Sequence, residues 1–133
     1  MAVSGGNRLG RIVLLVRDYD EAETFYAGAL GFAVLHDSSA QGQRFLHLGL
    51  PAQDASGGVG LWLLQPLPGQ EDLIGRQAGG QPLMVIYVDD CDAAVSRFVA
   101  QGGTVRLPPR GEGEARFAHV LDLYGNELVL VAF

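Results

Sequence analysis

Residues 11–47, with the sequence RIVLLVRDYDEAETFYAGALGFAVLHDSSAQGQRFLH, recur 72 positions later as residues 83–119, and the two segments align without a gap. Ten of the 37 aligned pairs are identical, whereas ordinary residue usage would give about two or three by chance. The identical pairs are Val13/Val85, Val16/Val88, Asp18/Asp90, Asp20/Asp92, Ala22/Ala94, Gly31/Gly103, Leu35/Leu107, Arg44/Arg116, Phe45/Phe117 and His47/His119. The repeat predicts two copies of one small unit, each built from the same elements in the same order.

Length and composition indicate one globular domain over residues 1–133. Of the 133 residues, 48% are hydrophobic and 18% are charged, which is typical of a folded chain and not of a disordered one. Each repeat is too short to bury a good core alone. We therefore expect the two units to share one hydrophobic core.

Charge and targeting signals narrow the choice of partner and compartment. The net charge is -6 at pH 7, and no run of Lys and Arg offers a stripe for phosphates, so we expect no nucleic acid partner and no membrane partner. Residues 1–7 lack the apolar stretch of a signal peptide, which favours a cytoplasmic location. The single cysteine, Cys91, makes no disulfide or metal motif by itself and is expected to be a passive thiol.

The first unit, residues 9–65, is predicted to have the order strand, helix, strand, strand, strand. Residues 11–16 form an apolar run rich in branched side chains, which is typical of a strand. Asp18, followed three residues later by Glu21, has the spacing of a capping box and indicates the start of a helix. Gly31 indicates the end of that helix. Three further strands are expected at residues 32–36, 44–50 and 59–65.

The second unit, residues 82–133, is predicted to repeat this order, with a helix that begins at Asp90 or Asp92. Its strands are expected at residues 83–88, 104–107, 115–121 and 127–133. Residues 66–81 contain glycine breaks and two prolines, so they are expected to connect the units and to be able to cover a site as a flap. Mobile hairpin loops are expected at residues 37–43 and 108–114.

Two motifs make this arrangement resemble a known family. The first has the pattern V-x-D…FY…LGF, and the second, near the end of the chain, has the pattern D-x-x-G-N-x-x-x-L. Their residues are Val16, Asp18, Phe25, Tyr26, Leu30, Gly31 and Phe32, then Asp122, Gly125, Asn126 and Leu130. Together with the duplicated βαβββ unit, they resemble the vicinal oxygen chelate superfamily, which holds glyoxalase I, extradiol dioxygenases, fosfomycin-resistance transferases and bleomycin-resistance proteins.

The resemblance implies an α+β fold of two tandem βαβββ units. Their curled mixed sheets would form half barrels that enclose the site, with the helices on the outer face. It also implies a homodimer, because bleomycin-resistance-like members bind their ligand between two chains. A fold shared by so many reactions does not itself name one.

The resemblance further locates four positions at which metal-dependent members of the superfamily hold their ion. In this chain those positions carry Arg11, Trp62, Leu83 and Val129. None of these side chains offers a usable lone pair at neutral pH, whereas a divalent ion needs His, Cys, Asp or Glu around it. We therefore expect no metal and no other cofactor, which argues against the metal-dependent reactions of the superfamily.

Strand alternation indicates which side chains face the cavity. The predicted ligand-binding residues are Arg11, Phe45, His47, Trp62, Tyr87, Phe117 and His119. Trp62 suits stacking on a planar ligand, and Arg11 suits pairing with a carboxylate or phosphate. The pattern fits two outcomes equally well, a pocket for an apolar or aromatic compound and a barrel that these rings fill.

The leading hypothesis is a small-molecule-binding protein without the usual metal, which sequesters an apolar or aromatic compound. A second hypothesis is a metal-dependent lyase, isomerase or dioxygenase with relocated ligands drawn from His47, His119 and Glu127. A third is a metal-free enzyme that uses His47 or His119 as a base, although retained repeat sequence with local hydrogen bonds explains both histidines more simply. Glu127 itself is expected to be solvated, because it lies at the turn end of its strand. A fourth hypothesis is an interaction module with a filled barrel.

Overall fold

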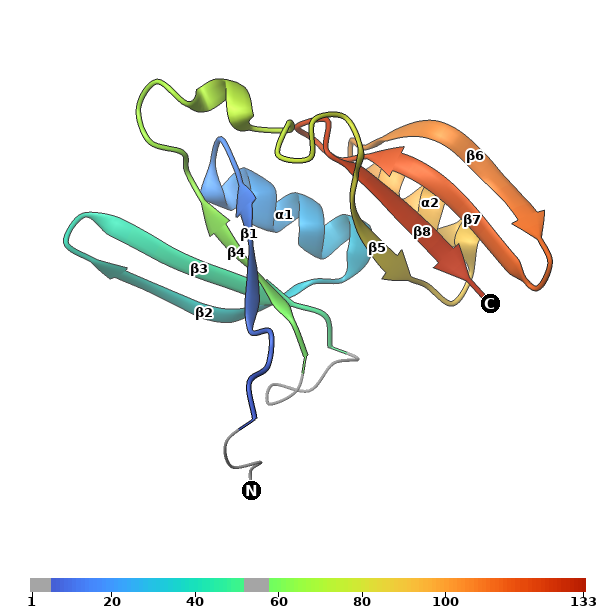
Figure 1. Cartoon of the computed structure of the whole chain (residues 1–133), viewed down its shortest axis with the longest axis horizontal. Helices are drawn as coiled ribbons and strands as arrows, with labels where there is room; N and C mark the ends of the chain where they lie inside the picture. The colour runs from blue at the N-terminus through green and yellow to red at the C-terminus, as the bar shows by residue number, and fades with distance from the viewer. Residues whose placement is uncertain (1–5, 52–57) are drawn as a thin grey trace.

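The computed structural model describes residues 6–51 and 58–133 and contains two units with the same order of elements (Figure 1). The first unit consists of β1 (Arg11–Leu15), α1 (Tyr19–Leu30), β2 (Ala33–Ala40), β3 (Gln43–Gly49) and β4 (Gly60–Leu64). The connector carries a short 3-10 helix, η1 (Glu71–Leu73). The second unit consists of β5 (Pro82–Tyr87), α2 (Cys91–Ala100), β6 (Thr104–Glu112), β7 (Ala115–Leu121) and β8 (Glu127–Ala132). The predicted βαβββ order is confirmed in both units.

Each unit forms its own four-stranded mixed sheet, and the two sheets lie toward opposite ends of the long axis in Figure 1. The strand orders are β1-β4-β3-β2 and β5-β8-β7-β6. In each sheet the first strand runs parallel to the last, and the other neighbours are antiparallel. The predicted α+β class with two tandem units is confirmed, and the described strands do not close into a barrel.

Both helices begin at the aspartates that the repeat aligns. Asp18 accepts a hydrogen bond from the Glu21 backbone N–H at 2.9 Å, and Asp90 accepts one from the Ala93 N–H at 3.0 Å. Each bond satisfies a backbone donor that the first turn of a helix leaves without a partner. Gly31 follows α1 at a φ of 79°, a left-handed conformation that glycine adopts without steric cost. Asp90, and not Asp92, is therefore the cap of α2.

The expected hairpin loops at residues 37–43 and 108–114 are a wrong prediction, because both stretches are largely strand. β2 continues to Ala40 before a tight turn, and β6 continues to Glu112. Asp and Ser favour turns when local preference decides, but here cross-strand pairing with β3 prevails, as where Asp37 faces Leu46. Pro108 is tolerated in β6 because this strand lies at the sheet edge and its register shifts between Leu107 and Arg110.

One hydrophobic core is shared by the two units, as the sequence predicted. α1 packs against α2, and Phe25 meets Phe98 edge to face with 5.1 Å between ring centroids, a favoured geometry for aromatic pairs. Buried strand residues of both units belong to the same cluster, among them Leu14, Leu46, Leu63, Ala118, Val120 and Leu130. The described helices include none that is long and apolar enough to cross a membrane.

A repeated ion pair ties each sheet to its own helix. Arg44 on β3 lies 2.9 Å from Asp20 of α1, and Arg116 on β7 lies 2.6 Å from Asp92 of α2. All four residues belong to the identical pairs of the repeat. Their recurrence in both repeats is therefore explained by one structural role that is performed twice.

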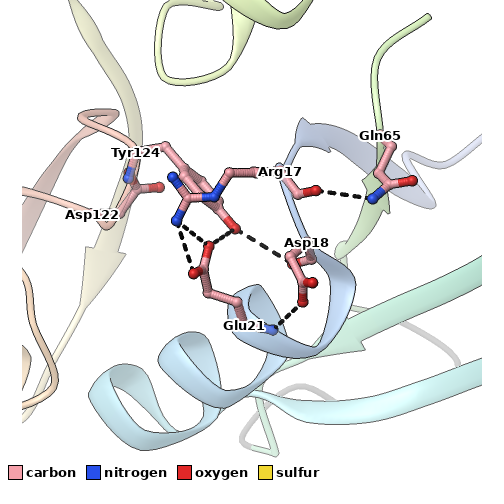
Figure 2. Close-up of polar contacts among 6 residues, drawn as sticks. All are labelled: Arg17, Asp18, Glu21, Gln65, Asp122 and Tyr124. Carbon is pink, nitrogen blue, oxygen red and sulfur yellow. Dashed lines mark hydrogen bonds and ion pairs between the residues drawn. The ribbon is translucent and has the colours of Figure 1, made fainter.

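Hydrogen bonds between polar side chains connect the turn between β7 and β8 to the start of α1 (Figure 2). The Tyr124 hydroxyl donates to the Glu21 carboxylate at 2.9 Å, and Arg17 donates two hydrogen bonds of 2.8 Å to the same carboxylate. Partial burial and this carboxylate raise the pKa of Tyr124 to about 12, so the phenol stays a donor at neutral pH. Gln65, at the end of the first sheet, donates to the Arg17 carbonyl at 2.9 Å.

Candidate functional site

Side chains alternate between two faces of each sheet, as predicted from strand periodicity. One face is buried in the core, with Leu46, Leu48 and Leu63 fully buried in the first sheet. We call the opposite face, where side chains stay partly exposed, the open face. The seven predicted ligand-binding residues all lie on strands β1, β3, β4, β5 and β7 at alternate positions to such core residues.

On the open face of the first sheet, four predicted site residues form one cluster. Phe45 and Trp62 stack with 6.3 Å between centroids and 25° between ring planes. His47 lies 6.0 Å from the Trp62 ring, and Arg11 Nε donates a hydrogen bond to His47 Nδ1 at 3.1 Å. The cluster combines a flat aromatic surface with a cationic group, which suits a planar molecule that carries a polar or acidic substituent.

A groove with a volume of ≈ 800 Å³ borders Trp62 where the first sheet meets the connector. Leu15, Leu64 and Pro66 contribute to its lining. The Trp62 Nε1–H is buried and has no hydrogen-bond partner among the described residues. A buried donor left unsatisfied costs about 1–3 kcal/mol, and a bound molecule would recover that free energy only by moving the ring so that the N–H reaches an acceptor.

The environment of His47 favours its neutral form. Burial, with a smaller contribution from the Arg11 guanidinium, lowers the pKa of His47. Arginine can only donate hydrogen bonds, so the Nδ1 atom that accepts from Arg11 carries the lone pair. The proton of neutral His47 therefore sits on Nε2.

We expect His47 to reduce the stability of the protein as the medium becomes acidic. Because the pKa of His47 is lower in the folded state, the folded chain binds fewer protons than the unfolded chain. The contribution of His47 to the free energy of unfolding is therefore present above its unfolded pKa of about 6.5 and is lost as the pH falls below it. The substitution His47→Gln should flatten the decline in free energy of unfolding between about pH 7 and pH 5, measured by urea denaturation. An unchanged slope would contradict the pKa assignment.

On the open face of the second sheet, Phe117 and His119 lie side by side on β7, with 6.1 Å between ring centroids. His119 Nδ1 is 2.6 Å from Glu127 Oε2, and Arg106 Nη1 is 3.2 Å from the same oxygen. Glu127 is only 5% exposed. The expectation of a solvated Glu127 is therefore wrong, because neighbouring strands cover this carboxylate and supply two cationic or donor partners that offset its desolvation.

Sequence analysis missed Arg106 and also Arg110, whose guanidinium lies 5.2 Å from the Phe117 ring centroid. Residues 108–114 were assigned to a loop, so their side chains were given no face of the sheet. Pairing of Arg110 with Phe117 shows that the strand pattern continues past the two prolines. No sequence signal identifies Arg106 as a partner of Glu127, because this contact depends on the register shift.

The structure divides the predicted site residues into two groups. Arg11, Phe45, His47 and Trp62 lie on the first sheet, and Tyr87, Phe117 and His119 lie on the second. Tyr87 is 75% exposed at the β5 edge and meets Phe133 edge to face at 5.5 Å. Among the described residues, no hydrogen bond or aromatic contact joins the two groups within one chain.

The residues at the four superfamily metal positions do not suit a metal ion. Arg11 and Trp62 lie on the first sheet, and Leu83 and Val129 lie on the second, and none offers a ligand atom. Over residues 6–51 and 58–133, no group of three His, Cys, Asp or Glu side chains is placed to hold one ion. Within one chain the hypothesised relocated set is not brought together, because His119 and Glu127 contact each other while His47 lies on the other sheet.

Comparison with known proteins places this geometry in a family. Residues 8–130 match the model of the Glyoxalase/Bleomycin resistance protein/Dioxygenase superfamily. An uncharacterised protein of Shewanella frigidimarina is 36% identical over 118 residues, which cover 86% of this chain and 85% of that protein.

Solved structures show the same fold. UcmS2 superposes with a TM-score of 0.77 at 26% identity, covering 95% of this chain and 98% of that one. TnmS3, an antibiotic binding protein from Streptomyces sp. CB03234, superposes with a TM-score of 0.74 at 23% identity, covering 96% and 97%. These likenesses extend over nearly the whole chain, so both units and their connection take part in the shared fold.

Proposed function

Because the chain belongs to the glyoxalase/bleomycin resistance protein/dioxygenase superfamily, whose fold hosts many functions, we propose that it is a metal-free binding protein for a small aromatic compound. The observation that carries this proposal is the cluster on the first sheet. It has a stacked pair of aromatic rings, a buried indole donor without an acceptor, and a cationic side chain beside them. The structural similarity to TnmS3, an antibiotic binding protein, supports a small-molecule ligand.

We propose that the working form is a homodimer in which the open face of one chain's second sheet covers the first sheet of its partner. In a single chain both open faces are uncovered. Apolar side chains are exposed on the open face of the second sheet, with Val85 at 55% and Tyr87 at 75% exposure. Exposed apolar surface of this kind marks an interaction site, and a twofold arrangement buries the same surface on both chains.

An apolar groove of ≈ 570 Å³ supports this arrangement. It runs between the edges of the two units and is lined by residues that include Leu61, Leu83 and Val85. Light scattering should give a mass of two 14.1 kDa chains. A monomer at micromolar concentration would contradict the homodimer without affecting the cluster on the first sheet.

The chain's single tryptophan provides the test of binding. A panel of naphthalene derivatives with neutral, acidic and basic substituents should include compounds that change Trp62 fluorescence saturably. At a hundredfold excess over its dissociation constant, such a compound should raise the free energy of unfolding by about 2.7 kcal/mol. If no compound in the panel changes both the fluorescence and the stability, the proposal is wrong.

Elemental mass spectrometry on untagged protein incubated with Zn, Ni, Mn and Fe(II) tests the metal-free part of the proposal. We expect far less than one equivalent of each metal after desalting. Near-stoichiometric metal that is lost in His119→Ala would instead favour relocated ligands.

A further inference from the structure

The two histidines related by the repeat are held in opposite hydrogen-bonding states. His47 Nδ1 accepts from Arg11 at 3.1 Å, so its Nε2 carries the proton and can only donate. His119 Nδ1 lies 2.6 Å from the Glu127 carboxylate. Its proton is therefore assigned to Nδ1, and its Nε2 can only accept. Identical residues at equivalent positions of the two sheets therefore offer different chemistry to a bound molecule.

The Glu127 side chain lies among donor and cationic side chains. It is 5% exposed, and the same Oε2 atom is 3.2 Å from the Arg106 guanidinium. A carboxylate only accepts hydrogen bonds, so His119 Nδ1 is the donor between the two residues. The lone pair of neutral His119 is thereby left on Nε2, for which the described residues supply no hydrogen-bond partner. Where an imidazole accepts a proton on one ring nitrogen, a second group holds the other ring nitrogen in this way.

The surroundings of His119 also favour an anion. From β6, Arg106 lies beside Glu127, and Arg110 lies over the Phe117 ring next to His119. From β8, Glu127 contributes one negative charge, which Arg106 offsets. This cationic surface belongs to a chain whose net charge is -6, so the local charge is opposite to that of the whole molecule. Phe117 adds an aromatic surface at the same place.

We infer that His119, positioned by Glu127, accepts a proton from the bound compound, and that this compound carries an acidic hydroxyl on an aromatic or enolic system. The hydroxyl O–H bond breaks, its proton forms a bond to His119 Nε2, and the electron pair stays on the oxygen, which is bound as the anion beside imidazolium and Arg106. No oxidant or reductant is needed. The inference rests on the proposed function, because it names the chemical class of the compound bound between the open faces.

The test compares 4-nitrophenol with its methyl ether, 4-nitroanisole, which has no proton to give. Both should change Trp62 fluorescence if the proposed function is right. The yellow colour of the nitrophenolate reports ionisation directly. We expect the ionisation midpoint of bound 4-nitrophenol to lie at least about one pH unit below that of the free compound, as an adjacent cation produces.

Two variants separate the roles of the residues. His119→Gln should abolish most of the shift in ionisation midpoint, because the proton acceptor is gone. Glu127→Gln should also reduce the shift, because the carboxylate that orients His119 Nδ1 is gone. Arg116→Gln is the matched control, because it removes a cation from the same strand that pairs with Asp92 of α2, and it should leave the shift unchanged.

Three outcomes would overturn the inference. A shift that persists in His119→Gln would assign the effect to the arginines alone. If both probes bind equally and the ionisation midpoint of 4-nitrophenol is unshifted, His119 does not accept its proton. The proposed function would then be unaffected. Absence of binding by both probes would overturn the proposed function together with this inference. Because His119→Gln changes a partly exposed side chain, it keeps the test decisive if Glu127→Gln does not fold.

Discussion

Replacing Asp122 by alanine is expected to lower the free energy of unfolding by about 4 kcal/mol, the largest effect we predict for a single residue outside the apolar core. Asp122 is 4% exposed and lies directly after β7. Its Oδ1 accepts from the backbone N–H groups of Tyr124 and Asn126, both at 2.9 Å. Its Oδ2 accepts from the Asn126 side chain at 3.0 Å and from the Tyr26 hydroxyl.

The size of the effect follows from the partners that would be left behind. Tyr26 on α1 is 1% exposed, and burial, with the Asp122 carboxylate, raises its pKa well above the ordinary value, so it remains a protonated donor. Without Asp122, this hydroxyl and the turn's N–H groups lose a charged acceptor. Hydrogen bonds to charged groups contribute about 1.5–3 kcal/mol each, and unsatisfied buried donors cost more than exposed ones.

Urea denaturation with an unchanged m value measures the loss. Asp90→Ala is the matched control, because the exposed Asp90 carboxylate makes a single capping bond to the Ala93 N–H, and its removal should cost about 1 kcal/mol. The loss of free energy of unfolding in Tyr26→Phe should lie between the losses in Asp122→Ala and Asp90→Ala, since three of the hydrogen bonds to Asp122 remain. Equal losses for Asp122→Ala and Asp90→Ala would show that the buried network does not hold the two units together.

Replacing Trp62 by alanine is expected to weaken binding of the tightest naphthalene derivative by at least about thirtyfold, a loss of about 2 kcal/mol that is typical of a central aromatic contact. The side chain provides the stacking surface beside Phe45 and lies next to the Arg11–His47 pair. Alanine removes both the ring and the unsatisfied indole donor. Isothermal titration calorimetry is the appropriate measurement, because the substitution removes the only fluorescent tryptophan.

Trp62→Phe separates stacking from hydrogen bonding. It keeps an aromatic surface and removes the buried N–H that has no acceptor in the described part of the chain. We expect an intermediate affinity with little loss of stability, since removing an unsatisfied buried donor recovers its desolvation cost. Unchanged affinity in Trp62→Ala, with a folded protein by circular dichroism, would place the ligand elsewhere and contradict the site.

The repeat predicted more of the architecture than any single motif. Its identical pairs turn out to perform paired structural roles, as Asp18 and Asp90 do at the helix starts and Arg44 and Arg116 do between sheet and helix. Such roles depend on contacts within one unit. A pattern that occurs twice in the sequence therefore predicts them twice in the structure.

Strand lengths and the candidate site were predicted less completely. Local preference placed a loop at residues 37–43, whereas pairing with β3 extends β2 to Ala40. The seven predicted site residues do lie on the open faces, because alternation with period two is a local property of strands. Whether the two sheets bring these residues together within one chain was not predicted, since the sequence does not state how the units are placed relative to each other.

The sequence by itself determined the two βαβββ units, the shared core and the start of α1 at Asp18, because each follows from residue type and spacing along the chain. The family resemblance located the superfamily's metal positions, whose residues in this chain offer no ligand atoms. Only the tertiary structure decided that Glu127 is buried against His119 and Arg106, and that His47 and His119 offer a donor and an acceptor respectively. Those properties arise from contacts between side chains on different strands. They depend on register shifts and on burial by neighbouring strands, which no local pattern of residues encodes.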